Sequence, residues 1–269
     1  MLRYNIIKGD KNVDKLRAKQ GFICDMDGVI YHGNRLLDGA LEFVNWLQES
    51  EKRFLFLTNS SKSSPKELSQ KLSRMGLNVD ESHFYTSALA TAQFLSVQSP
   101  NCSAFVIGDS GLLNALYERG ITMNDVDPDY VIVGETQNYN YDHIIKASGF
   151  INKGAKLIGT NYDLTGPTEQ GMVPATRALI SPIELATGKL AYFVGKPNPL
   201  IMRTGKKLLG CQSEDTVIVG DNMDTDIKAG LESGIDTVLV LSGVSAKDTP
   251  LGYAYRPDYI LNGVGDIVG

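Results

Sequence analysis

Short apolar runs rich in β-branched and aromatic residues alternate along the chain with longer segments of helical periodicity. The runs GFICD at 21–25 and RFLFL at 53–57 are separated by an amphipathic segment at 39–49 that predicts a helix. Comparable runs follow at 103–108, 129–134, 156–160, 192–197, 216–221, 236–241 and 258–261. Parallel strands linked by crossover helices produce this alternation. The chain is therefore predicted to be an α/β protein built on parallel strands.

Four polar motifs end the predicted strands or follow them directly. They are DMDG at 25–28, TNSS at 58–61, GKP at 195–197 and GDNMDTD at 220–226. In doubly wound sheets, ligands bind beyond the carboxyl ends of the strands. We therefore expect the polar tails of these strands to lie side by side.

The chain has 269 residues, which exceeds one average domain. This length allows either one continuous sheet of many strands or a core interrupted by an inserted domain. The stretch between TNSS and GKP contains none of the four motifs. We therefore predict a core formed by residues 1–85 and 191–269, with residues 86–190 inserted as a separate α/β domain.

Asp25 and Asp27 are separated by Met26 just after a buried strand, so both carboxylates can face the same pocket. Because two nearby carboxylates repel each other, the pair favours a bound divalent cation or a shared proton. Oxygen ligands suit Mg²⁺, which keeps several waters and usually takes one or two carboxylates together with a substrate phosphate. One aspartate can be a nucleophile while the other transfers protons, and Gly28 allows the chain to turn there.

The other motifs supply the remaining parts of a phosphate site. Thr58 and Asn59 can donate hydrogen bonds to phosphoryl oxygens, and Lys196 offsets the negative charge of the phosphate. Asp221 offers another carboxylate to the metal, and Asp226 can orient the metal's waters or Lys196. Two structural alternatives stay open. Asp226 can cap the helix that begins in DIKAGLESG, and Thr58 and Asn59 can form an N-cap and turn before the next helix.

The ordered motifs resemble those of the haloacid dehalogenase superfamily, in which DxDG, a Ser or Thr, a Lys and GDxxxxD follow one another. DMDGV, LTNSS, VGKPNP and GDNMDTDI are most similar to the NagD or 4-nitrophenylphosphatase subfamily. The similarity covers nearly all of the chain apart from its leading stretch and the details of the inserted domain. It implies a Rossmann-like parallel-sheet core carrying an inserted α/β cap of the C2 type.

The resemblance also implies roles for the acidic residues. Asp25 would form an aspartyl-phosphate, and Asp27 would protonate the leaving oxygen and then activate water. The metal would be bound by the Asp25 carboxylate, the Asp27 main-chain carbonyl and Asp221. The related dehalogenases and P-type ATPases lack an aspartate at the position of Asp27, so its presence favours a phosphatase.

Further residues of the same motifs would hold the phosphoryl group among fixed donors, as phosphoryl transfer requires. They are Thr58, Asn59, Ser60 and Lys196. Asn222 and Asp226 would orient the metal ligands without binding the metal themselves.

The polar segment GTNYDLTGPTEQG at 159–171 follows a predicted strand of the inserted domain and is rich in turn formers. It is a candidate for closing over the leaving group, with Asn161 and Asp163 as specificity residues. An ordinary exposed loop would have the same composition.

We expect a phosphomonoesterase that acts on small phosphorylated metabolites. The substrates are expected to be small because an α/β cap over the pocket would restrict access to molecules of that size. Sugar phosphates, nucleoside monophosphates and aryl phosphates such as p-nitrophenyl phosphate fit this expectation. The alternative is a non-enzymatic phosphate-sensing or phosphoacceptor module similar to response-regulator receivers, which are shorter and have no inserted cap. Related proteins often pair through their caps, so a homodimer of this kind is a further expectation.

The net charge of −5, without any run of Lys or Arg, argues against binding to nucleic acid or to an anionic membrane. The three cysteines lack a CxxC spacing, which argues against a disulfide framework or a zinc site. The chain shows neither a secretory signal nor an apolar run that could span a bilayer. A reducing cytoplasmic location fits these features.

Overall fold

The computed structural model describes residues 10–168 and 171–269, and the chain divides into two compact units. The first unit comprises Met1–Thr58, Lys71–Phe84 and Met202–Gly269, and the second comprises Asn59–Gln70 and Tyr85–Ile201. The first nine residues lie outside the described part. This division differs from the predicted boundaries, because residues 59–70 group with the second unit although they precede residue 86.

A six-stranded sheet in the order β15-β14-β13-β1-β4-β5 forms the centre of the first unit. The strands are β1 Gly21–Cys24, β4 Arg53–Thr58, β5 Phe84–Thr86, β13 Thr216–Gly220, β14 Asp236–Val240 and β15 Tyr259–Leu261. The pairs from β15 to β4 are parallel. The order of the strands along the chain reverses between β1 and β13, which makes the sheet doubly wound.

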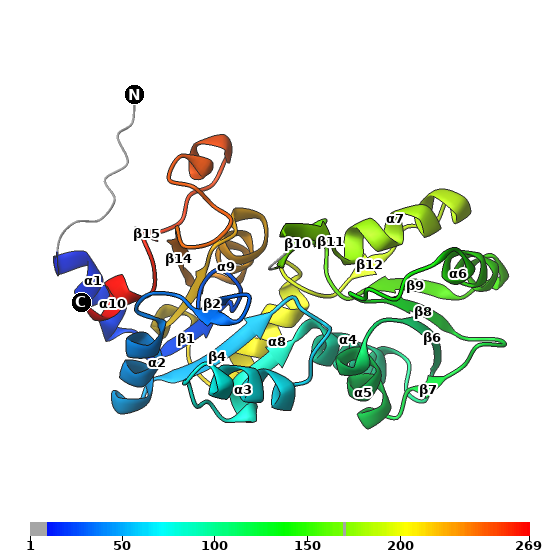
Figure 1. Cartoon of the computed structure of the whole chain (residues 1–269), viewed down its shortest axis with the longest axis horizontal. Helices are drawn as coiled ribbons and strands as arrows, with labels where there is room; N and C mark the ends of the chain where they lie inside the picture. The colour runs from blue at the N-terminus through cyan, green and yellow to red at the C-terminus, as the bar shows by residue number, and fades with distance from the viewer. Residues whose placement is uncertain (1–9, 169–170) are drawn as a thin grey trace. The chain divides into compact units, whose positions relative to one another are not determined.

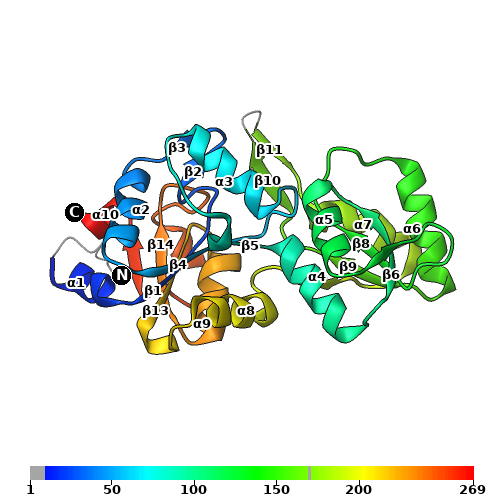
Figure 2. The ribbon, with the colours of Figure 1, turned by 90° about the horizontal axis from the view of Figure 1, so that it is seen from below.

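The helices of the first unit cover both faces of this sheet (Figure 2), with α2 on one side and α9 on the other. They are α1 Asp10–Ala18, α2 Ala40–Glu49, α9 Lys228–Ser233 and α10 Gly265–Val268, and α3 Pro65–Arg74 and α8 Pro199–Leu209 each belong in part to both units. Helical coverage of both faces explains why β1 and β13 are buried along their whole length.

Close contacts fix two of these helices against the strands. The ring of Phe22 in β1 meets Trp46 of α2 edge-to-face, with centroids 5.5 Å apart. On the other face, a Cβ at Gly230 of α9 would lie 2.5 Å from side-chain atoms of Ile218 and Thr237, so the helix backbone approaches the sheet as only glycine allows. The shorter elements are β2 Tyr31–His32, β3 Arg35–Leu36, 3-10 turns at Glu81–His83, Ser213–Asp215 and Thr249–Gly252, and a π-helical turn at Met223–Ile227.

The second unit is built on a five-stranded sheet in the order β12-β9-β8-β6-β7, with parallel pairs throughout. Its strands are β6 Ser103–Ile107, β7 Thr122–Met123, β8 Tyr130–Val133, β9 Lys156–Gly159 and β12 Tyr192–Phe193. Its helices are α4 Ser87–Gln98, α5 Ser110–Glu118, α6 Tyr141–Lys153 and α7 Thr176–Thr187. Figure 1 shows α4 and α5 on one side of this sheet and α6 and α7 on the other. Both units are therefore α/β with parallel sheets, as predicted.

The predicted polar loop at 159–171 is more regular than its composition indicates. Part of it forms β10 Thr165–Thr168, which pairs antiparallel with β11 Gly171–Pro174. Residues 169 and 170 lie outside the described part. Glycine and proline in both strands hide the hairpin from analysis by composition, because these residues are rare in strand interiors.

The strand expected at 192–197 is short and belongs to the second sheet. Only Tyr192 and Phe193 pair with β9, opposite Ile158 and Gly159. The predicted core resumes at residue 191, whereas the structure places this strand in the second unit. An apolar run predicts a strand but not its neighbour, which explains the difference. Among the described residues, no helix is both long and apolar enough to cross a membrane.

Candidate active site

The carboxyl ends of β1 and β13 meet at the point where the strand order of the first sheet reverses. Asp25 follows β1 directly, and its backbone N–H donates to the carbonyl of Val219 at 2.9 Å. Asp221 follows β13 directly. In doubly wound sheets this position is the usual ligand site. The sheet thus places two of the predicted acidic residues where its topology favours ligand binding.

Three carboxylates gather at this edge of the first unit. Oxygens of Asp25, Asp221 and Asp226 lie within 4.8 Å of one another. Asp25 is partly buried, whereas Asp221 and Asp226 are buried. Oxygen-only ligands favour a hard divalent cation, and three close negative charges with little access to water repel one another unless a cation is bound. The residues therefore fit a divalent metal ion.

Asp27 follows Asp25 by two residues, beyond the end of β1. Both are half-buried, whereas Met26 between them is completely buried. The chain turns after them, because Gly28 has φ 76° and its N–H donates to the carbonyl of Tyr31 at 2.9 Å. The side chain of Asp27 is not a member of the three-carboxylate group.

Gly28 and the loop at 242–244, which the sequence analysis missed, fix the position of Asp221. Its Oδ2 atom accepts a hydrogen bond of 2.8 Å from the N–H of Val244. A Cβ at Gly28 or at Gly243 would lie 2.3 Å or 1.9 Å from the same oxygen. Ser242 donates to the carbonyl of Gly28 at 2.7 Å. The signal for these residues was the small polar tail LSGVS after the predicted strand at 236–241.

Asp226 differs from the prediction that it caps the following helix. It lies within the π-helical turn and is not the cap of α9, which begins at Lys228. Its Oδ2 accepts a hydrogen bond of 3.2 Å from the N–H of Asn222, whose own side chain accepts from Asp224 N at 2.9 Å. Asp226 therefore offers a carboxylate to the metal group itself, and Asn222 supports it through the main chain.

Thr58 is the last residue of β4 and is buried. The alternative in which Thr58 and Asn59 cap the next helix is not what the structure shows, because α3 begins only at Pro65. Ser64 and Glu67 cap that helix instead. The Glu67 carboxylate accepts from the N–H of Ser64 at 2.7 Å, and Ser64 Oγ accepts from the N–H of Glu67 at 3.3 Å.

A second group of predicted residues comes together within the second unit. The Asn59 side chain bonds to the main chain of Lys196 and to the carboxylate of Asp163. Asn161 Nδ2 donates to the carbonyl of Asn59 at 2.8 Å. Asn59, Asn161 and Lys196 are buried, and Asp163 is partly buried. Asn161 and Asp163 are therefore part of a largely buried polar network, unlike residues of an ordinary exposed loop.

Ser60 belongs to the same segment and contacts a carboxylate that the sequence analysis did not identify. Its hydroxyl donates to Oε2 of Glu135 at 3.0 Å. Two further hydrogen bonds join Ser61 and Glu135. The N–H of Ser61 donates to Oε2 of Glu135 at 3.2 Å, and the N–H of Glu135 donates to Oγ of Ser61 at 3.0 Å. Glu135 follows β8, so its position after a strand was the available signal.

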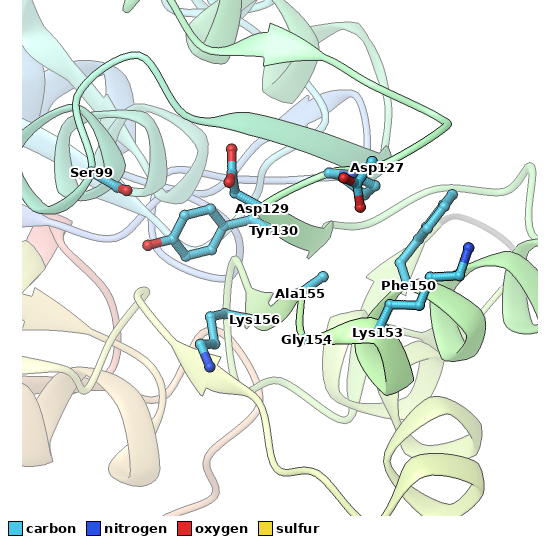
Figure 3. A pocket seen from close by; sticks show the side chains of 10 residues that line it. Ser99, Asp127, Asp129, Tyr130, Phe150, Lys153, Gly154, Ala155 and Lys156 are labelled. Atoms are coloured by element: carbon cyan, nitrogen blue, oxygen red, sulfur yellow. The ribbon is translucent and has the colours of Figure 1, made fainter.

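One pocket of the second unit (Figure 3) lies at the amino ends of β8 and β9. It has a volume of about 390 Å³, with Asp127 and Asp129 on one side and Lys153 and Lys156 on the other. The carboxylate of Asp129 accepts hydrogen bonds from the N–H of Ser103 at 2.8 Å and from the Ser103 hydroxyl at 2.9 Å. These hydrogen bonds lower the pKa of Asp129. The pocket contains none of the predicted site residues.

Comparison with known proteins supports the family suggested by the motifs. The haloacid dehalogenase-like hydrolase family matches residues 22–122, and a HAD-hydrolase-like family matches residues 193–267. The ribonucleotide monophosphatase NagD of Escherichia coli K12 is 43% identical over 245 residues, which cover 91% of this chain and 96% of NagD. The dihydroxyacetone phosphatase of Corynebacterium glutamicum is 41% identical over 246 residues, or 91% and 90% of the two chains.

Solved structures show the same relationship. The structure of NagD from E. coli K-12 has a TM-score of 0.87 at 42% identity, covering 93% of this chain and 98% of that one. The 4-nitrophenylphosphatase of Thermotoga maritima has a TM-score of 0.89 at 32% identity, covering 95% and 97%. This chain therefore belongs to the haloacid dehalogenase-like hydrolases, within their NagD-like phosphatase subfamily.

Proposed function

We propose that this enzyme is a Mg²⁺-dependent phosphatase that hydrolyses small phosphate monoesters through an aspartyl-phosphate on Asp25. The observation that carries the proposal is the group of Asp25, Asp221 and Asp226 at the reversal point of the first sheet. A nucleophilic carboxylate beside a divalent-cation site is the arrangement that phosphoryl transfer to an aspartate requires.

The roles of the acidic residues follow from their chemistry. Asp25 Oδ attacks phosphorus as the ester P–O bond breaks, and Asp27 gives its proton to the leaving oxygen. Water then attacks the phosphorus of the aspartyl-phosphate and gives a proton to Asp27. The bond between phosphorus and the Asp25 carboxylate breaks, so that phosphate is released and Asp25 is restored. Bound Mg²⁺, held by Asp25, the Asp27 carbonyl, Asp221 and in part Asp226, would offset the negative charge that otherwise repels the phosphate.

Thr58 and Lys196 are proposed to hold the phosphoryl oxygens, together with main-chain amides of the segment that contains Ser60, whose hydroxyl already donates to Glu135. Lys196 is buried, which places its positive charge where water screens it little. The second unit is proposed to act as the C2-type cap. The homodimer through this cap and the cytoplasmic location stay predictions from the sequence.

Small phosphorylated metabolites are the proposed substrates. Three kinds of relative support this class by their names: a ribonucleotide monophosphatase, a dihydroxyacetone phosphatase and acid sugar phosphatases of staphylococci. The substrates in these names have leaving groups that differ widely in shape, and their common feature is a phosphate ester on a small molecule. We therefore propose activity on several such esters rather than on one.

The test is hydrolysis of p-nitrophenyl phosphate with Mg²⁺, with EDTA, and by the Asp25→Asn variant. Asp127→Asn is a matched control, because Asp127 is exposed in the second unit. We expect activity only with Mg²⁺ and only in the wild type and the control. Turnover in EDTA or full activity of Asp25→Asn would contradict the mechanism. A phosphoenzyme that persists without turnover would instead support the phosphoacceptor alternative.

A further inference from the structure

We propose that the Asn59 side chain is a clamp that positions Lys196 through its main chain, and that Asp163 holds the clamp in place. This inference rests on the proposed function, since Lys196 is the residue proposed to hold phosphate. It gives Asn59 and Asp163 roles different from those expected from the sequence, where Asn59 binds phosphate and Asp163 meets the leaving group. Both are positioning residues.

The orientation of the Asn59 amide is determined by its neighbour. The backbone N–H of Lys196 lies 2.7 Å from Oδ1 of Asn59. A backbone N–H can only donate, so the atom that it meets must be the amide oxygen. The amide nitrogen therefore points the other way, toward the carbonyl of Lys196 at 3.1 Å and Oδ2 of Asp163 at 3.0 Å.

This geometry uses all the hydrogen-bond donors of the Asn59 side chain. A primary amide has two N–H groups, and the two acceptors are the Lys196 carbonyl and the Asp163 carboxylate. The same amide both donates to and accepts from the main chain of Lys196, in the manner of a neighbouring β-strand. Neither amide hydrogen remains for a phosphoryl oxygen.

The main chain of Asn59 is held as firmly as its side chain. Its carbonyl accepts from Ser87 Oγ at 2.6 Å and from Asn161 Nδ2 at 2.8 Å. Asn59 is 8% exposed, and Ser87 and Asn161 are fully buried. A buried polar group that loses its partner pays the full cost of desolvation, so such a network favours a single arrangement.

The clamp is part of a larger arrangement at the carboxyl edge of the second sheet. Four neighbouring strands of that sheet, β12, β9, β8 and β6, are followed by residues that bond to the segment 59–62. These residues are Lys196 after β12, Asn161 and Asp163 after β9, Glu135 after β8 and Gly111 at the start of α5 after β6. The edge that binds ligands in many parallel sheets here binds a segment of the chain itself.

Gly195 shows how closely the two segments approach. A Cβ at this position would lie 2.7 Å from Oδ1 of Asn59 and 2.7 Å from the carbonyl of Thr160. The N–H of Gly195 donates to that same carbonyl at 2.8 Å. The glycine of the GKP motif is therefore required for the clamp to reach Lys196.

The experiment exchanges the two polar ends of the clamp. Asn59→Asp removes both amide donors and places a second carboxylate against Asp163, while Asp163→Asn keeps an acceptor for Asn59. In the double variant, the new amide at 163 can donate to the new carboxylate at 59, which restores one hydrogen bond of the pair. Asn114→Asp adds the same charge at an exposed position of α5 and is the matched control.

We expect kcat/KM to fall by about 100-fold in Asn59→Asp and by only several-fold in Asp163→Asn. The double variant should recover about tenfold relative to Asn59→Asp, and the control should match the wild type. The inhibition constant of inorganic phosphate, which reports the position of Lys196 without any leaving group, should rise and recover in the same order. If the double variant is no better than Asn59→Asp in both measurements, the clamp is overturned.

A second variant serves if Asn59→Asp does not fold. Asp163→Ala leaves one amide hydrogen of Asn59 without its acceptor and should lower kcat/KM by about tenfold. The loss should be equal for p-nitrophenyl phosphate, a nucleoside monophosphate and a sugar phosphate. A loss that depends on the leaving group would overturn the clamp and restore Asp163 as a specificity residue. The wild type is assayed before any variant. An inactive wild type would contradict the proposed function rather than the clamp.

Discussion

The main chain at Gly243 lies directly against the carboxylate of Asp221, so that a Cβ there would be 1.9 Å from Oδ2. The next residue, Val244, donates its N–H to the same oxygen at 2.8 Å. Gly243→Ala should therefore displace Asp221 from the metal group. We expect at least about a tenfold loss of kcat and a higher Mg²⁺ concentration for half-maximal activity. Gly252→Ala, where nothing lies within 4 Å of the added Cβ, is the control. Equal Mg²⁺ dependence in both variants would contradict this role.

Mg²⁺ should stabilise the folded chain through the three-carboxylate group. At a concentration of 100 times its Kd, a ligand specific for the folded state adds about 2.7 kcal/mol to the free energy of unfolding. Asp221→Asn removes one of the three charges while keeping an acceptor for Val244. The variant should be more stable than the wild type in EDTA and should gain little from Mg²⁺, as thermal unfolding measures. An equal gain in both proteins would place the cation elsewhere.

Two helical glycines of the second unit should respond oppositely to alanine. Gly149 of α6 is exposed, and nothing lies within 4 Å of an added Cβ. Gly149→Ala should raise the free energy of unfolding by about 1 kcal/mol, because alanine is the better helix former. In α5, a Cβ at Gly111 would lie 2.6 Å from the carbonyl oxygen of Lys62, so Gly111→Ala should lower stability. Urea unfolding of both variants tests the pair, and a shift in the same direction would contradict the packing described for α5.

Stability should fall between pH 10 and 12 because of Tyr253. Its hydroxyl donates to Asp224 Oδ2 at 2.7 Å, and this hydrogen bond, followed by burial, raises the pKa of Tyr253 to about 12. A tyrosine in the unfolded chain ionises near a pKa of about 10. As the pH rises through this window, the unfolded state loses a proton that the folded state keeps, so folding becomes less favourable.

The Tyr253→Phe variant lacks this titration and should lose less stability between pH 10 and 12 than the wild type. Tyr117→Phe, at an exposed position, should follow the wild type. Urea unfolding at several pH values across this range provides the measurement. A Tyr253→Phe profile parallel to that of the wild type would show that the hydrogen bond to Asp224 does not carry the effect.

Much of the fold could be predicted because local patterns determined it. The strand at 21–24 and the helix at 40–49 lie within one residue of their expected ends, since apolar periodicity and glycines mark both. The pairing of strands within the sheets could not be predicted from these local patterns. Tyr192 and Phe193 look like residues of any buried strand, and only pairing with β9 assigns them to the second sheet.

The site shows a similar division. Asp25 and Asp221 were found because each follows a strand, and the sheet order then brings them together. Gly243 and Glu135 were missed because their importance depends on contacts with residues distant in sequence. The partners of Asn59 were hidden for the same reason, since no local pattern shows that an amide bonds to the main chain of Lys196.

The bonds between segment 59–62 and the second sheet bear on how these proteins can exchange parts. A chimera that replaces only residues 85–201 with those of a relative would keep the native segment 59–62 but surround it with foreign strand ends. Its Asn59 and Ser60 would then face partners that did not evolve with them. Transplanting a cap between members of this subfamily should therefore succeed more often when both stretches of the second unit are moved together.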